Sequence, residues 1–101
     1  GNLWIVTDGT QPHDNNDGCF ACPTSGPERG LLKQLMSGPV GCEVGGCEFT
    51  PDNGTLFLSI QHPGEGGTLK DPKSHWPDGG DSQPRPSVIA IRRKDGGVVG
   101  T

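Results

Sequence analysis

Residues 48–60 read EFTPDNGTLFLSI, and this stretch decides the fold class of the 101-residue chain. From residue 55 onward it is dominated by leucine, aromatic and β-branched side chains, the composition of a buried strand. The Asn53-Gly54 pair just before it is typical of a tight turn, because asparagine and glycine most readily adopt positive φ angles. We therefore expect a strand over residues 55–61 that follows a turn.

Similar signals lie on both sides of this stretch. Residues 2–7 and 87–93 are rich in apolar and β-branched side chains and are bounded by turn residues, so each predicts a strand. Residues 29–37 are ambiguous, because their leucines and Met36 recur at helical spacing although the segment spans only about two turns. The remaining long segments, 8–27 and 62–86, are rich in glycine, proline and aspartate and are expected to be loops.

Two of the expected strands resemble each other. Residues 1–5 (GNLWI) and 54–58 (GTLFL) share glycine, leucine, an aromatic and an aliphatic residue in the same order. A repeat with glycine before each strand suggests a β-propeller, although a match over a five-residue stretch can also arise by chance. The prediction is an all-β fold, part of a β-propeller of about two blades with long Gly/Pro-rich loops. Two blades cannot close a ring, so exposed strand edges would be covered by the rest of the chain or by self-association.

Composition excludes several classes of protein. The chain has 18 glycines, 10 prolines and only 29% hydrophobic residues, which excludes a helix bundle, and the glycines lack the period of collagen. The net charge is −4 with no basic stripe, so nucleic acid is not an expected partner. Apolar runs such as residues 3–6 are too short to span a membrane. Residues 1–101 show no signal-peptide pattern, and we interpret them as a single fragment of a longer protein.

Four cysteines, Cys19, Cys22, Cys42 and Cys47, come close to the spacing of a four-thiolate zinc site. The second pair has four intervening residues instead of two, and a proline follows Cys22. The simpler interpretation is two disulfides, or buried thiols that act as small apolar side chains. We do not expect zinc at these cysteines.

Several longer motifs resemble the PhoX family of bacterial alkaline phosphatases over nearly the whole chain. They are GPERG (26–30), GPVGCEV (38–44), FTPD (49–52), LFLSIQHPGE (56–65), SHWPDG (74–79) and PRPSV (84–88). The resemblance implies a six-bladed β-propeller and a phosphatase that hydrolyses phosphate monoesters with an iron–calcium site. It also implies a periplasmic or secreted location, reached by a twin-arginine signal that this chain does not contain, and it favours a strand at residues 29–37.

The same resemblance suggests site residues. Glu43 would be a metal ligand of the iron–calcium cluster, since a carboxylate supplies the hard oxygen that both ions accept. Arg85, between two prolines, would clamp the substrate phosphate. Glu48 and Asp8 are weaker candidates for metal ligands, because carboxylates beside turns often only cap backbone amides. His62 is interpreted as a structural hydrogen-bonding residue.

The chain departs from that family in its cysteines. The resemblance places alanine where Cys42 stands and proline where Cys47 stands, and the iron-binding cysteine of the family lies upstream. The implied mechanism is metal-assisted phosphoryl transfer, in which metals hold phosphate oxygens and an arginine neutralises developing charge. Because a propeller assembles such a site from several blades, the fragment alone is expected to be inactive. The alternative is a non-enzymatic propeller segment that binds a ligand or a protein through its long loops.

Overall fold

The computed structural model describes residues 1–9 and 15–101, and within these ranges all regular structure is β-structure. The all-β prediction is therefore confirmed. No helix in this part of the chain has the length and apolar character required to cross a membrane. The strands are β1 (Asn2–Val6), β2 (Gly18–Pro23), β3 (Lys33–Ser37), β4 (Glu43–Phe49), β5 (Leu56–Gln61) and β6 (Ser87–Ile91).

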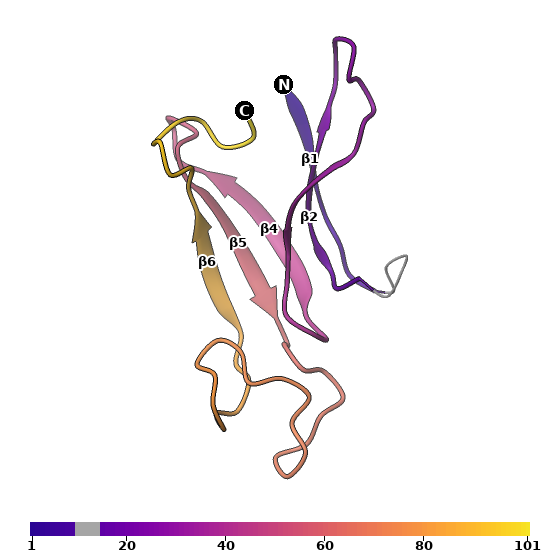
Figure 1. The fold of residues 1–101 in the computed structure, drawn as a ribbon, viewed down its shortest axis with the longest axis vertical. Coiled ribbons are helices and arrows are strands. Elements are labelled where there is room, and N and C mark those ends of the chain that lie inside the picture. Colours follow the sequence, from indigo (N-terminus) through magenta and orange to yellow (C-terminus); the bar gives the residue numbers. More distant parts are fainter. Residues whose placement is uncertain (10–14) are drawn as a thin grey trace.

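These strands form two three-stranded antiparallel sheets in the orders β1-β2-β3 and β4-β5-β6. Figure 1 shows the sheets side by side, with the long segment between β5 and β6 extending beyond one end of the second sheet. The sheets meet where β1 ends and β4 begins, and there the Val44 amide donates to the Thr7 carbonyl over 3.1 Å. Two such sheets are compatible with propeller blades, and the number of blades stays a prediction.

The turn between β4 and β5 forms where the sequence predicts it. The Thr50 amide donates to the Thr55 carbonyl over 3.0 Å, and the Asn53 amide donates to the Thr50 carbonyl over 2.8 Å. Of the Asn53-Gly54 pair, only Asn53 has a positive φ, at 56°. The Gly54 amide instead donates to the Asp52 carboxylate over 3.0 Å. One left-handed residue and one side-chain acceptor are therefore enough to reverse the chain here.

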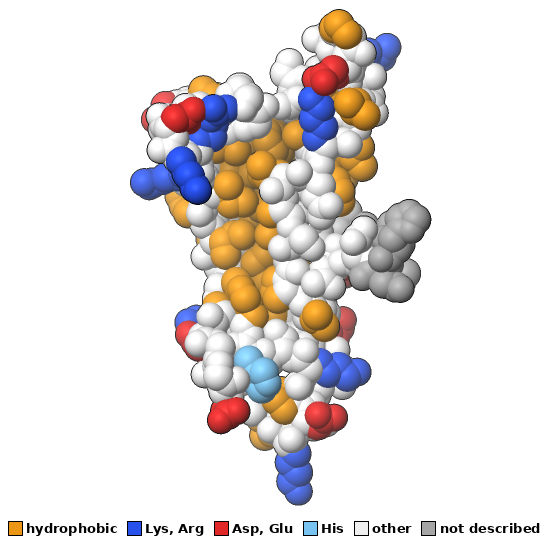
Figure 2. All heavy atoms as spheres, viewed as in Figure 1, with side chains coloured by type: hydrophobic (Ala, Val, Ile, Leu, Met, Phe, Trp, Pro, Cys, Tyr) orange, Lys and Arg blue, Asp and Glu red, His pale blue; other side chains and the backbone are white. Residues whose placement is uncertain are grey.

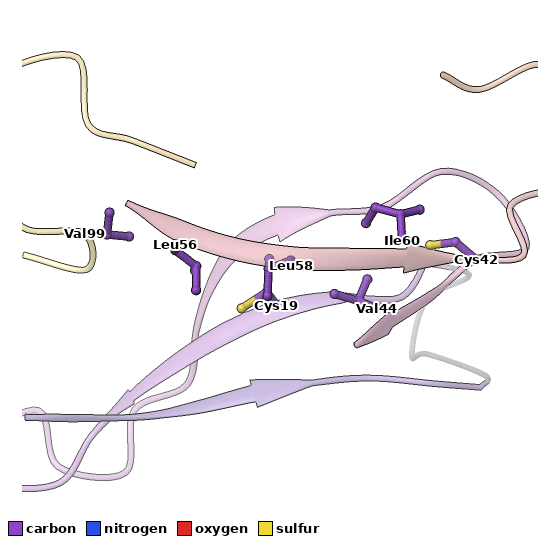
Figure 3. Close-up of a cluster of buried hydrophobic side chains, with 7 residues drawn as sticks. All are labelled: Cys19, Cys42, Val44, Leu56, Leu58, Ile60 and Val99. Atoms are coloured by element: carbon purple, nitrogen blue, oxygen red, sulfur yellow. The ribbon is translucent and has the colours of Figure 1, made fainter. Parts of the chain in front are cut away.

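The core lies on one face of the second sheet. Leu56, Leu58 and Ile60 alternate along β5 and are at most 1% exposed, whereas Phe57 between them points to the other face and is 38% exposed. Figure 3 shows Cys19 of β2 reaching the same layer beside Leu58. The buried cluster consists of Cys19, Cys42, Val44, Leu56, Leu58, Ile60 and Val99. Because it draws side chains from both sheets, burial of apolar surface holds the two sheets together.

Each sheet contains an irregularity at a cysteine. The pairing of β2 with β3 shifts between Cys19 and Phe20, and the pairing of β4 with β5 shifts between Gly45 and Glu48. Val44 and Phe49 lie five positions apart, which would place them on opposite faces of a regular strand. Both nevertheless pair with core residues of β5, because the β-bulge inserts an extra residue between them.

The prediction of a loop over residues 8–27 is wrong in part, because β2 lies within this segment. Glycine, proline and two cysteines make this segment resemble a loop, yet it pairs on both sides and forms the centre of its sheet. Strand β4 was also not predicted, because its Gly45-Gly46 pair weakens the strand signal. Residues 10–14 of the predicted loop lie outside the described residues.

Only the second half of the segment 29–37 forms a strand, which is β3. The residues before it form a turn, in which the Leu31 amide donates to the Glu28 carbonyl over 2.9 Å. The helical spacing of the leucines was misleading, because pairing with β2 determines the conformation of this segment. The segment 62–86 contains no strand or helix, and its Trp76 packs against the core.

A band of apolar side chains remains visible over β4, β5 and β6, as Figure 2 shows. Val88 of β6 is 71% exposed. Among the described residues, β3 and β6 each have a strand on one side only. The second sheet thus presents apolar surface and a free edge to solvent.

Candidate metal site

Three strand ends bring two carboxylates and an imidazole together. Asp8 lies just beyond β1, Glu43 is the first residue of β4, and His62 directly follows β5. Glu43 pairs with Gln61, the last residue of β5, so His62 emerges beside it. The hydrogen bond between β4 and Thr7 places the end of β1, and with it Asp8, at the same point. The ligand atoms of Asp8, Glu43 and His62 all lie within 4.8 Å of one another.

The His62 ring is held in one orientation by a backbone carbonyl. Its Nδ1 lies 3.0 Å from the Gly41 oxygen, and because a carbonyl only accepts, Nδ1 must be the donor. In the neutral ring the lone pair is then on Nε2, which lies 3.3 Å from Glu43 Oε2. This is the arrangement of metal-binding histidines, whose second nitrogen commonly donates to a carbonyl. The same hydrogen bond to Gly41, together with Glu43 and Glu65, raises the pKa of His62.

Glu43 is held by its strand partner. Gln61 Nε2 donates to Glu43 Oε1 over 3.3 Å, while the other carboxylate oxygen faces His62. The Glu43 side chain is 31% exposed and that of His62 is 38% exposed, so both remain accessible from solvent. Glu65 Oε2 lies 3.6 Å from His62 Nδ1 and adds another carboxylate nearby.

Asp8 and His62, but not Glu43, border a hollow of about 260 Å³ that is lined only by acidic, small and histidine side chains. Among the described residues, the lining contains no lysine or arginine. Several carboxylates that lie close together, with no cationic side chain among them, favour the binding of a positive ion. The described lining residues are Asp8, Gly9, Asp17, Gly41, Cys42, His62 and Glu65.

Gly41 is required by this geometry. Its φ is +71°, and a Cβ atom at this position would lie 2.8 Å from the Glu65 amide nitrogen. A side chain here would therefore push the 62–65 segment away from the Gly41 carbonyl that orients His62. The turn is closed by the Gly64 amide, which donates to the Val40 carbonyl over 2.7 Å.

These donors fit calcium or iron. Carboxylate oxygens suit calcium, and carboxylates combined with an imidazole suit iron. Calcium takes about six to eight oxygen ligands, more than three side chains supply. The group can hold one side of a cation, and further ligands would have to come from elsewhere.

The structure brings Asp8 and Glu43 together, but not Glu48. Glu48 lies at the far end of β4, roughly 16 Å along the strand from Glu43, and is exposed. His62 is part of the group although its sequence position suggested a purely structural residue. The signal that could have found it is the pairing of β4 with β5, because His62 continues β5 beside the strand that begins at Glu43.

Arg85 is held by a carboxylate of its own loop. Its Nε and Nη2 donate to the two oxygens of Asp78 over 2.7 and 2.9 Å, and its Nη1 donates to Ser87 over 3.4 Å. The guanidinium lowers the pKa of Asp78. Arg85 does not line the hollow beside Asp8 and His62. The structure therefore leaves it apart from the metal-ligand candidates.

The four cysteines are all free thiols. Cys19 and Cys47 contact each other between the sheets, whereas Cys42 lines the hollow and Cys22 lies further along β2. Within the described part of the chain, no three of the cysteine sulfurs come together as a possible metal site.

Comparison with known proteins gives two matches. The family model "Alkaline phosphatase PhoX" matches residues 1–64. The solved structure of Pseudomonas fluorescens PhoX in complex with vanadate, a transition state analogue, is 43% identical and superposes with a TM-score of 0.80. That match covers 99% of this chain and 17% of the Pseudomonas chain. None of the curated proteins matches the chain.

Proposed function

Because this chain belongs to the alkaline phosphatase PhoX family, we propose that it forms part of a metal-dependent phosphatase that hydrolyses phosphate monoesters. One observation carries the proposal: Asp8, Glu43 and His62 converge on one point, and all three lie within the residues that the family model matches. The structural relative binds vanadate, described as a transition state analogue, which supports a phosphate ester as the substrate.

The proposed cofactors are calcium and iron, held in part by Asp8, Glu43 and His62. When bound, such a cation supplies positive charge that offsets the charge of a phosphoryl group. Glu43 contributes one carboxylate oxygen while Gln61 fixes the other. His62 keeps its proton on Nδ1, against the Gly41 carbonyl, so that Nε2 stays free to bind. These contacts orient the ligands before the ion arrives.

Arg85 remains the proposed phosphate clamp, with Asp78 as the residue that orients it. Three of its donors are engaged, which leaves one N–H each on Nη1 and Nη2 for a phosphate oxygen. The test is a change of Arg85 to lysine, which keeps the charge but removes the fork-shaped donor pair. It should raise the KM for p-nitrophenyl phosphate in the complete enzyme, whereas an unchanged KM would contradict a clamp.

This chain spans 17% of the length of the Pseudomonas structure, so we propose that it supplies only part of the site. The isolated chain should not hydrolyse p-nitrophenyl phosphate when calcium and iron are added. Measurable turnover under these conditions would overturn this part of the proposal.

Calcium titration of the chain tests the site itself. Calorimetry should detect binding that weakens about tenfold or more in Glu43→Gln, because removal of one hard ligand charge costs on the order of 1.4 kcal/mol or more. Glu48→Gln removes the same charge from the same strand, far from the group, and should bind nearly as the parent does. Equal weakening in both variants would show a diffuse charge effect. Absence of calcium binding would favour the alternative, a propeller segment that binds through its loops.

The apolar band and the free edges of β3 and β6 support a further part of the proposal: they are covered by the rest of the protein or by a second copy. An isolated chain should then lose its cooperative melting transition on dilution. A monomer that melts sharply at every concentration would exclude this. The family also supports a periplasmic or secreted location, which cell fractionation would test.

A further inference from the structure

Two of the four thiols meet between the sheets. Cys19 of β2 is 0% exposed, and Cys47 of β4 is only partly exposed. The two thiols are close enough for each to influence the pKa of the other. Both belong to the apolar layer that holds the sheets together, Cys19 inside the cluster and Cys47 packed against it. The contact thus joins two strands that share no backbone ladder.

The β-bulge in β4 explains why Cys47 faces the core layer that contains Cys19. In β4 the extra residue lies between Gly45 and Glu48, and it turns Cys47 to the face that carries Val44. Glycine at position 46 accommodates the turn with a φ of +64°. In the first sheet the pairing shifts directly after Cys19, but the extra residue there is Leu35 of β3. The bulge in β4 thus determines the face that carries Cys47, whereas Cys19 keeps the regular alternation of β2.

We propose that Cys19 and Cys47 are a disulfide-forming pair that covalently links the two sheets. The oxidant is a disulfide such as oxidised glutathione. The Cys47 thiolate attacks one sulfur of that disulfide, forms a mixed disulfide and releases one thiol. Cys19 then loses its proton, attacks the Cys47 sulfur and releases the second thiol. Overall, two protein thiols are oxidised to one S–S bond, and one external disulfide is reduced to two thiols.

Exposure assigns the order of these steps. Cys47 is partly exposed and can meet an external disulfide, whereas Cys19 is inaccessible and can react only with a neighbour. Burial raises the pKa of the Cys19 thiol to about 12 and also raises the pKa of Cys47. Only the thiolate reacts, so the link should form slowly at neutral pH and faster as the pH rises.

The other two cysteines serve as controls within the chain. Cys22 lies opposite Leu3, which is 56% exposed, away from the core end of β2. Cys42 is buried beside the carboxylate of Asp17, which contributes to the raised pKa of Cys42. Neither shares the contact between Cys19 and Cys47.

The experiment is an alkylation and peptide map of the purified protein after incubation with oxidised glutathione at about pH 8.5. Free thiols are then blocked with iodoacetamide in denaturant. Cleavage after Phe20 separates Cys19 from Cys22, and cleavage after Glu43 separates Cys42 from Cys47. We expect the oxidised protein to take up two fewer alkyl groups and to yield one linked peptide pair that contains Cys19 and Cys47.

Variants make the result specific. Cys47→Ser and Cys47→Ala should both retain all remaining thiols after oxidation, whereas Cys22→Ser should still form the link. A peptide pair that involves Cys22 or Cys42, or full alkylation of the oxidised parent, would overturn the proposal. So would a product that carries only glutathione adducts.

Discussion

Replacement of Gly41 by alanine tests whether close backbone contact builds the metal site. Two costs are expected. Alanine at a φ of +71° is strained by about 1–2 kcal/mol, and its Cβ would lie 2.8 Å from the Glu65 nitrogen and 3.1 Å from the Gly64 Cα. Because both neighbours are backbone atoms, the 62–65 segment must shift, and overpacking of this kind costs about a further 1–3 kcal/mol.

The matched control is Gly79→Ala. Gly79 has a φ of +76°, and its Cβ would meet nothing within 4 Å, so the control carries the backbone strain alone. In urea unfolding followed by tryptophan fluorescence, Gly41→Ala should therefore lower the free energy of unfolding by about 1–3 kcal/mol more than Gly79→Ala. Calcium affinity should fall in Gly41→Ala and remain unchanged in Gly79→Ala. If Gly41→Ala and Gly79→Ala had the same free energy of unfolding and the same calcium affinity, the role assigned to the close contact between Gly41 and the 62–65 segment would be refuted.

Two further changes test the core and the loop. Leu58→Ala should lower the free energy of unfolding by about 2–5 kcal/mol, because the Leu58 side chain is buried at 1% exposure. In the same urea assay Val88→Ala should change it by less than about 0.5 kcal/mol, because Val88 is 71% exposed. Similar values for the two variants would contradict the assigned core face. Arg85 lowers the pKa of Asp78 in the folded protein. The ion pair therefore stabilises the fold at pH values above about 4, the pKa of an aspartate in the unfolded chain. This contribution is lost as the pH falls through the lower pKa that Asp78 has in the folded protein. The difference in unfolding free energy between the parent and Asp78→Asn should therefore shrink between about pH 5 and pH 2, and a difference independent of pH would contradict the ion pair.

The sequence predicts those parts of the fold in which local preference and burial agree. Strand β5 has apolar residues at every core position and a turn residue, Asn53, three positions before its first residue. Its prediction needed no knowledge of a partner strand. Strand β2 was missed because its own composition is that of a loop. Its conformation comes from β1 and β3, which pair with it on both sides.

The candidate site was only partly predictable for the same reason. Asp8, Glu43 and His62 are far apart in sequence, and nothing local links them. They converge because β1, β4 and β5 all have an end at one point, which follows from pairing between strands. The sequence suggested Glu43 as a metal ligand and Asp8 as a weaker candidate, but the position of His62 at a strand end suggested a structural role. It also grouped Glu48 with them, although β4 carries that residue to its opposite end.

The bulge in β4 divides one strand into two halves with independent sequence constraints. The half that begins at Glu43 must keep its register with the end of β5, while the half that ends at Phe49 must keep its side chains toward the core. Deletion of the single codon for Gly46 would remove the extra residue and leave Val44 and Phe49 four positions apart. A regular strand would then carry Val44, Cys47 and Phe49 on the core face with the same partners in β5, and Glu43 would stay in place. Loss of this one residue would therefore change the local bend of the strand, but neither the side chains that face the core nor the position of Glu43.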